Sequence, residues 1–167
     1  LQSSSAASDV YKRQEKLNAL SNQLVLELRD QLEAFQASDD RVAIISAAGD
    51  KAFSVGADLK EPPRDPELWE CMPGTGVFID KPIIAAVHGY IVGGAYCLVQ
   101  FCDLCVADET ADFFYPEAQI GFCGGMIASH AGRVPYKLAM EFMLTGKHFD
   151  AERAYAVSYT HLRAHET

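Results

Sequence analysis

The sequence lacks features that several protein classes require. No apolar run approaches the roughly 20 residues of a membrane-spanning helix, although 49% of the 167 residues are hydrophobic. Basic residues are few, with 14 Lys and Arg against 23 Asp and Glu and a net charge of −9. This balance argues against a nucleic-acid surface but is compatible with a local basic pocket for an anionic ligand. We therefore expect a soluble globular chain that binds neither membranes nor nucleic acid.

Motifs of several enzyme classes are also missing. No Gly-x-Ser-x-Gly surrounds Ser54, which argues against a serine hydrolase, and residues 89–94 lack the Gly-x-Gly-x-x-Gly pattern of nicotinamide-binding folds. Cys102-x-x-Cys105 has no further ligands at the spacing of a zinc site. The five cysteines are an odd number without a secretory signal. We therefore expect reduced thiols in a cytoplasmic protein, and no metal.

The two ends of the chain differ from its middle. Residues 1–14 are rich in Ser and Ala and lack periodicity, and residues 157–167 break the composition again. Both ends resemble translated sequencing-adapter sequence. We therefore predict a non-native leader (1–14), a partial domain (15–156) and a non-native tail (157–167), and we leave both ends out of the fold prediction.

Strands alternate with helices between these ends, which predicts the α/β class with repeated β-β-α or β-α units. Ser21 is a plausible N-cap for a first helix that ends near residues 38–40, because apolar residues then recur at helical spacing. We expect strands at 42–47, 83–87, 103–107 and 112–115, and later helices at 95–101, 126–132, 135–144 and from 150.

Residues 81–97 are the stretch around which the rest is organised. Pro82 suits a strand start, Gly89 allows a sharp turn, and Gly93-Gly94 lead directly into an apolar helical run. Backbone N–H groups at such a helix start are unpaired and suit an anion or a developing oxyanion. A tight strand-to-helix turn without a ligand explains this stretch equally well.

A second strand-to-loop segment, residues 51–60, adds another glycine, and Asp58 can cap a short helix there. Two such loops can face each other at the strand ends of an α/β sheet, where ligands tend to bind. If each loop supplies one N–H group, the pair forms an oxyanion hole.

Residues 61–73 contain four prolines, which predicts an irregular excursion over the surface. Trp69 fits a packed surface aromatic better than a pocket wall.

Four motifs, in this order, resemble the crotonase (enoyl-CoA hydratase/isomerase) superfamily over residues 15 to about 156. They are Phe-Ser-Val-Gly-Ala-Asp-Leu-Lys at 53–60, Ala-Ala-Val-His-Gly-Tyr at 85–90 with Gly93-Gly94, Pro116-Glu117-x-x-x-Gly121, and Ala139-Met140-Glu141 with Leu144-Thr145-Gly146.

The resemblance implies a crotonase-like fold that is truncated at both ends, because a β-hairpin and a C-terminal helical group of the family have no counterpart here. It also implies an acyl-CoA thioester as substrate, with coenzyme A as part of the substrate and no other cofactor. A homotrimer, or a hexamer made of two trimers, is the implied assembly. Family members usually carry a longer helical insert where residues 61–73 stand, and this insert shapes the acyl pocket.

The resemblance assigns roles to particular residues. The backbone N–H groups of Ala57 and Gly94 are the oxyanion donors, and Glu117 is the acid–base residue. Burial among apolar neighbours raises a carboxylate pKa toward the range useful for proton transfer; a structural Glu117 that pairs with Arg133 is the alternative. Lys16 and Ala19 lie at the mouth of the coenzyme A site, although a solvated lysine before a helix explains Lys16 equally well. The implied substrate-binding residues are Lys16, Ala19, Gly56, Ala57, Asp58, Leu59, Gly93, Gly94, Pro116 and Glu117.

Cys97 departs from the family pattern. Family hydratases carry a second glutamate three residues after the second glycine of the Gly-Gly pair, where this chain has Cys97. A thiol with the reference pKa of about 8.5 is mostly neutral and substitutes poorly for a carboxylate base. A single glutamate still suffices to carry a proton between two carbons, as in isomerases. We therefore expect an enzyme of the enoyl-CoA hydratase/isomerase type, with a non-catalytic or weakened acyl-CoA-binding homologue as the alternative.

Overall fold

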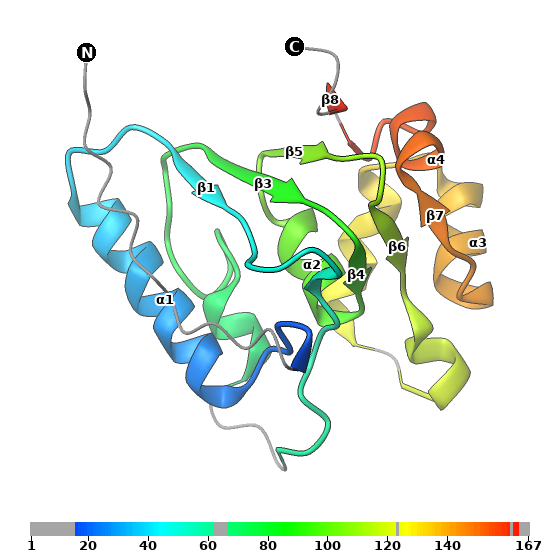
Figure 1. Cartoon of the computed structure of the whole chain (residues 1–167), viewed down its shortest axis with the longest axis horizontal. Coiled ribbons are helices and arrows are strands. Elements are labelled where there is room, and N and C mark those ends of the chain that lie inside the picture. The colour runs from blue at the N-terminus through cyan, green and yellow to red at the C-terminus, as the bar shows by residue number, and fades with distance from the viewer. Residues whose placement is uncertain (1–15, 62–66, 123, 161, 164–167) are drawn as a thin grey trace.

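The chain folds into two four-stranded sheets, in a computed structural model that describes residues 16–61, 67–122, 124–160 and 162–163 (Figure 1). The first sheet has the strand order β1-β3-β5-β8 and is parallel throughout. The second has the order β2-β4-β6-β7, in which only the β6-β7 pair is antiparallel. The strands are β1 (Ala43–Ile45), β2 (Ala52–Ser54), β3 (Ile83–Val87), β4 (Tyr90–Val92), β5 (Leu104–Ala107), β6 (Asp112–Phe114), β7 (Phe149–Asp150) and β8 (Leu162–Arg163).

The first six strands alternate between the two sheets. The first sheet takes β1, β3 and β5, and the second takes the strands that directly follow them, β2, β4 and β6. A helix or a 3-10 helix comes after each of these pairs. The predicted α/β class with repeated β-β-α units is therefore confirmed.

The helices cover the sheets on several sides. In Figure 1, α1 lies beside β1 at one end of the molecule, α3 and α4 lie at the other end, and α2 lies between them. Local sequence explains their limits: the Ser21 hydroxyl caps α1 by accepting the Leu24 N–H at 3.2 Å, and Gly146 ends α3 with a φ of +62°. The α-helices are α1 (Asn22–Ala37), α2 (Gly94–Gln100), α3 (Tyr136–Thr145) and α4 (Ala151–Ala156), and the 3-10 helices are η2 (Leu68–Cys71), η3 (Pro116–Ile120) and η4 (Gly125–Gly132).

An aromatic cluster around Tyr96 of α2 joins the elements at the centre of the core. The Tyr96 ring stacks on Tyr159 at 4.7 Å and contacts Phe142 at 4.6 Å, between ring centroids. Its hydroxyl forms a 2.9 Å hydrogen bond with His130 Nδ1, and burial lowers the pKa of His130 to about 4. Because all these rings are buried, the cluster ties α2 to α3 and η4.

The tail contributes to this packing. Tyr159 is buried and its hydroxyl donates to the Tyr96 carbonyl at 3.3 Å, a contact that the fold prediction omitted because it left out residues 157–167. The tail boundary at residue 157 stays a prediction, and the leader (1–14) lies outside the described residues.

Several local expectations were wrong. Residues 90–92 form β4 in the second sheet, although we expected only a turn between strand and helix there. Residues 116–120 form a 3-10 helix where no helix was expected, and the short helix expected at 126–132 is a 3-10 helix over 125–132. In residues 61–73, of which 62–66 lie outside the described part, η2 enters the core through buried Leu68 and Cys71, whereas Trp69 is exposed as expected. Asp58 caps no helix; its Oδ1 accepts the Lys60 N–H at 3.1 Å in a turn.

No helix within the described ranges is long and apolar enough to cross a membrane.

The cap of α1 provides a test of the fold. We expect Ser21→Ala to lower the free energy of unfolding by about 1 kcal/mol, because the buried hydroxyl then no longer accepts the Leu24 N–H. Urea denaturation measures the change. Ser46→Ala is the matched control, since Ser46 is exposed and should change stability by less than about 0.5 kcal/mol. Equal effects of the two substitutions would contradict the capping role.

Candidate active site

The start of α2 presents one backbone N–H group at the centre of the candidate site. Gly93, with a φ of +55°, turns the chain from β4 into α2, and its own N–H donates to the Phe114 carbonyl at 3.1 Å. Gly94 is the first residue of α2 and has no preceding helical carbonyl to bond. Within the described residues, no acceptor bonds the Gly94 N–H.

The loop after β2 places a second N–H group beside the first. Gly56 has a φ of +79°, and a methyl group added there would lie 2.6 Å from the Val92 carbonyl oxygen and 3.2 Å from the Gly94 nitrogen. The two loops are therefore in direct contact, which confirms the prediction that they face each other.

A short bridge with Leu20 sets the direction of the Ala57 N–H. Leu20 donates to the Gly56 carbonyl at 2.8 Å and accepts from the Asp58 N–H at 3.0 Å. Since N–H groups alternate sides along an extended segment, the Ala57 N–H faces away from Leu20. No hydrogen bond joins it to another residue of the described part, and a methyl group on Gly94 would lie 3.7 Å from the Ala57 nitrogen. Two such N–H groups suit an oxygen atom that carries negative charge.

Glu117 brings a carboxylate against the Gly-Gly turn. It lies on η3 directly after Pro116, and a methyl group on Gly93 would lie only 2.5 Å from Glu117 Oε1. Glu117 Oε2 is buried and has no hydrogen-bond partner among the described residues. Burial raises the pKa of Glu117 to about 7, against a smaller lowering effect of its own backbone N–H. A carboxyl group of this pKa can both accept and donate a proton near neutral pH.

The surroundings of Glu117 differ in part from those expected. Burial of Glu117 among apolar neighbours was expected, but Ile120, at the end of η3, and Phe122, just after it, are exposed. Arg133 does not form the alternative ion pair; it lies over the Phe101 ring and donates to the Ser129 carbonyl at 3.2 Å.

Cys97 lies one helical turn after Gly94 and close enough to Glu117 for their charges to interact. Its side chain is 1% exposed, and burial raises the pKa of Cys97 to about 12, with a further contribution from Glu117. The thiol is therefore even less acidic than its reference value suggests, and it stays neutral beside the carboxyl group.

The structure brings together five of the ten predicted site residues. Lys16 Nζ is 3.6 Å from the Oδ2 atom of buried Asp58, so its side chain leans onto the loop after β2. Leu59, in contrast, is 85% exposed. The residues brought together are Gly56, Ala57, Gly93, Gly94 and Glu117, with Pro116 starting η3 and Ala19 buried before α1.

Sequence reasoning missed two leucines that line the site. A methyl group on Gly94 would overlap Leu68 Cδ2 and would lie 3.7 Å from Leu20 Cδ1. Leu68 belongs to the proline-containing segment, where no periodicity or motif marks it. Only the fold brings it to the start of α2.

The described residues contain no group of three or more His, Cys, Asp or Glu side chains that could hold a metal ion.

Comparison with known proteins gives consistent results. Residues 10–158 match the enoyl-CoA hydratase/isomerase family. The chain is 37% identical over 151 residues to the mitochondrial enoyl-CoA hydratase of Pongo abelii, covering 85% of this chain and 52% of that protein. It is 39% identical over 150 residues to a probable enoyl-CoA hydratase of Rhizobium meliloti, covering 85% of this chain and 58% of the relative. The chain thus spans little more than half the length of these curated relatives.

A solved structure agrees with the fold. The structure of a carnitinyl-CoA dehydratase from Mycobacterium avium 104 has a TM-score of 0.81 and 34% identity, covering 92% of this chain and 62% of that one. This similarity confirms the predicted crotonase-like fold.

The raised pKa of Glu117 predicts how stability depends on pH. Below pH 4.5, its ordinary pKa, the carboxyl group is protonated in both folded and unfolded chains. Between pH 4.5 and 7 the unfolded chain loses this proton first, so the folded state loses stability as pH rises. Glu117→Gln removes this loss. We therefore expect the free energy of unfolding of the variant, relative to that of the unmodified chain, to rise by about 1–2 kcal/mol from pH 4 to pH 8, after allowance for the partial exposure of Glu117.

Urea denaturation at the two pH values tests this expectation. Glu141→Gln is the control, because Lys147 lowers the pKa of Glu141 and so gives the opposite sign. A Glu117→Gln chain whose stability changes with pH in parallel with that of the unmodified chain would show that burial does not perturb this carboxyl group.

Proposed function

This chain belongs to the enoyl-CoA hydratase/isomerase family, and on that premise we propose that it processes acyl-CoA thioesters by proton transfer at a carbon next to the thioester carbonyl. One observation carries the proposal. The Glu117 carboxyl group, whose buried Oε2 atom has no hydrogen-bond partner in the described part, lies against Gly93, and the N–H groups of Ala57 and of the next residue, Gly94, are unbonded in that part. We propose that coenzyme A enters as part of the substrate and that no other cofactor takes part.

The proposed mechanism assigns one task to each group. The thioester oxygen accepts hydrogen bonds from the Ala57 and Gly94 N–H groups. Glu117 takes a proton from a carbon next to the carbonyl, and the electron pair of the broken C–H bond moves onto the thioester oxygen to give an enolate. The two N–H groups bind this developing charge more strongly than the neutral carbonyl, and removal of one such donor typically costs about 3–4 kcal/mol in the transition state.

Return of the proton completes the reaction. The protonated Glu117 can deliver its proton to a different carbon of the enolate system, which shifts the double bond and restores the carboxylate. This is an isomerisation with a single acid–base residue, and atoms and charge balance without water. The neutral Cys97 thiol, with a pKa of about 12, supports this variant over hydration because it offers no second carboxylate to activate water.

A non-catalytic or weakened acyl-CoA-binding protein is the second candidate. The same neutral thiol favours it, since Cys97 stands where family hydratases carry their second glutamate. The fold alone does not decide between the two, because one scaffold can support different functions.

The identity of the reaction can be tested with two substrates. The chain is given a 2-enoyl-CoA and, separately, a 3-enoyl-CoA, and the absorbance of the conjugated thioester is followed. We expect a gain of conjugation from the 3-enoyl substrate and little loss from the 2-enoyl substrate. Rapid loss of conjugation from the 2-enoyl substrate would indicate hydration instead of isomerisation. No absorbance change with either substrate, despite measurable binding, would favour the binding protein.

Variants at Glu117 and Cys97 separate their roles. We expect Glu117→Gln to lower kcat at least about 100-fold while thioester binding survives, because positioned acid–base groups contribute roughly 10²–10⁴-fold. Cys97→Ala should keep kcat within a few fold, because a neutral thiol moves no proton. Comparable losses in both variants would contradict the single-glutamate mechanism.

The pH profile provides an independent check. The reaction begins with Glu117 as a base, and its pKa is about 7. We therefore expect kcat/KM to fall roughly tenfold per pH unit below about pH 7 and to level off above it. A profile that stays flat down to pH 5 would exclude Glu117 as the base.

A further inference from the structure

Two consecutive residues before α1 adopt a backbone conformation that most side chains disfavour. Leu17 has a φ of +50° and Asn18 a φ of +54°, and Ser158 is the only other non-glycine residue with a positive φ in the part of the chain that the structure describes. This left-handed conformation is unfavourable for leucine, whereas asparagine tolerates it. Such residues persist only where surrounding contacts hold them, and they gather at functional sites. We therefore looked for what holds residues 16–20, which we call the strap.

The Asn18 side chain anchors the strap beside β2. Its amide nitrogen Nδ2 donates to the Ala48 carbonyl at 2.9 Å and to the Ala52 carbonyl at 3.0 Å. The two acceptors lie 30 and 34 residues further along the chain, before β2 and at its first residue. Because carbonyl oxygens only accept hydrogen bonds, the side chain must supply two donors, which an amide nitrogen does. Asn18 thus combines a tolerated left-handed backbone with the paired donors that this position needs.

The backbone of the strap runs along the loop that carries Ala57. The Leu17 carbonyl accepts the Val55 N–H at 3.2 Å, and Leu20 bonds to the residues on either side of Ala57. The strap is therefore joined to this loop both before and after Asn18.

These contacts set the direction of the Ala57 N–H group. Leu20 occupies one side of the loop, so the Ala57 N–H lies on the opposite side, and a methyl group on Gly94 would lie 3.7 Å from the Ala57 nitrogen. If the strap shifts along β2, the Ala57 N–H moves with it. Because a hydrogen bond weakens steeply when its angle is poor, such a shift weakens the bond to an oxygen that both N–H groups hold.

We propose that Asn18 is a positioning residue for the Ala57 N–H group, which it holds in place beside the Gly94 N–H group through the strap. This inference rests on the proposed function and deepens it, because it names what aligns one of the two donors to the thioester oxygen. Asn18 acts through Leu20 and not by contact with the substrate.

Asn18→Gly tests the anchor directly. Glycine adopts a φ of +54° without strain, so the variant keeps the backbone conformation and loses the two side-chain donors. With a 3-enoyl-CoA we expect kcat to fall at least about tenfold while KM stays within about threefold, because a misplaced donor weakens binding of the transition state more than binding of the substrate.

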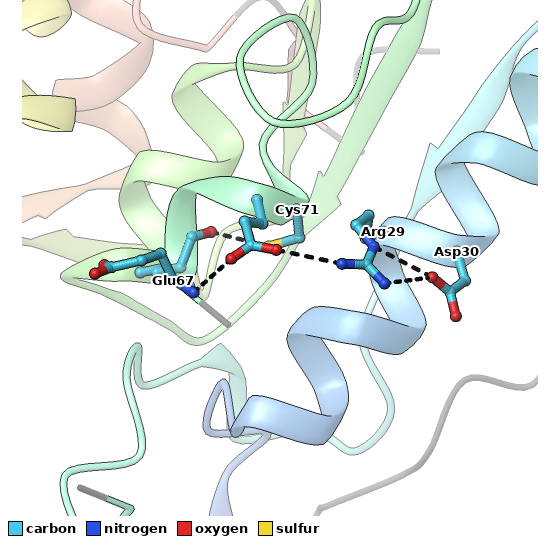
Figure 2. A network of polar contacts seen from close by, with 6 residues as sticks. Arg29, Asp30, Glu67 and Cys71 are labelled. Carbon is cyan, nitrogen blue, oxygen red and sulfur yellow. Dashed lines mark hydrogen bonds and ion pairs between the residues drawn. The ribbon is translucent and has the colours of Figure 1, made fainter. Parts of the chain in front are cut away.

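Arg29→Ala is the matched control for a loss of stability. Arg29 of α1 pairs with Asp30 at 3.1 Å and with Glu70 of η2 at 3.2 Å, in the network that Figure 2 shows, and no hydrogen bond or ion pair joins it to a described residue of the strap. We expect this variant to be less stable in urea but to keep kcat within about twofold. A kcat that falls in both variants in proportion to their loss of stability would show that Asn18 acts only on the fold, and would overturn the inference.

A bound enolate provides a readout that a purely structural role would not change. The probe is 3-oxobutanoyl-CoA, which loses a proton between its two carbonyl groups to give an enolate with negative charge on the thioester oxygen and its own ultraviolet absorbance. The two N–H groups favour this charged form, so the unmodified chain should lower the pKa of the bound probe below its value in solution. In Asn18→Gly we expect the pKa of the bound probe to rise by about 1, which is a tenfold weaker preference for the enolate, while the affinity for butanoyl-CoA changes less than about threefold.

The outcomes separate this inference from the proposed function. The probe needs no turnover, so a chain that binds it without processing either enoyl-CoA fails as an enzyme, and a raised probe pKa in Asn18→Gly still supports the role of Asn18. A probe pKa that is the same in Asn18→Gly and in the unmodified chain would overturn the inference, even if the unmodified chain isomerises its substrate. If Asn18→Gly does not fold by circular dichroism, Asn18→Ser, which keeps one hydroxyl donor, gives the same comparison with a smaller expected rise of about 0.5.

Discussion

The burial of α2 is the constraint on which the rest of the structure depends. Every residue of this helix is buried, so its first turn lies away from bulk water. The unpaired N–H groups of a buried helix start cost free energy unless an acceptor reaches them. The two glycines before and at that start let other groups approach, Glu117 at Gly93 and Leu68 at Gly94. The candidate site therefore lies where the start of the helix leaves backbone N–H groups without hydrogen-bond partners.

Exclusion of water sets the chemistry of the side chains around this helix start. The same burial that raises the pKa of Glu117 to about 7 raises the pKa of Cys97 to about 12. These shifts have opposite consequences: they make the carboxyl group exchange protons at neutral pH, and they remove the thiol from acid–base chemistry. One environment therefore leaves a single proton carrier, which is the physical basis for the proposed one-glutamate reaction.

The two walls of the site are held in different ways. Glu117 stands on a 3-10 helix whose neighbouring apolar side chains, Ile120 and Phe122, face the surface. Leu68 stands on η2, which is rooted in the core and joined to α1 by an ion pair. The Arg29–Glu70 pair is partly buried, with side-chain exposures of 30% and 27%.

Local sequence was enough to determine the elements whose signals lie within a few residues. The Ser21 cap, the apolar run of β3, the Gly146 stop and the paired glycines before α2 were all recognisable, because each depends on local hydrogen bonding or backbone freedom. The resemblance to the family, in contrast, is what named Gly56, Gly94 and Glu117 as site residues in advance. Only the tertiary structure decided that residues 90–92 form a strand in a second sheet and that Leu68 lies against Gly94. It also decided that Glu117 Oε2 has no hydrogen-bond partner in the described part, while Arg133 lies over Phe101. These features join segments far apart in the chain, and desolvation and close packing, which create them, have no local signature.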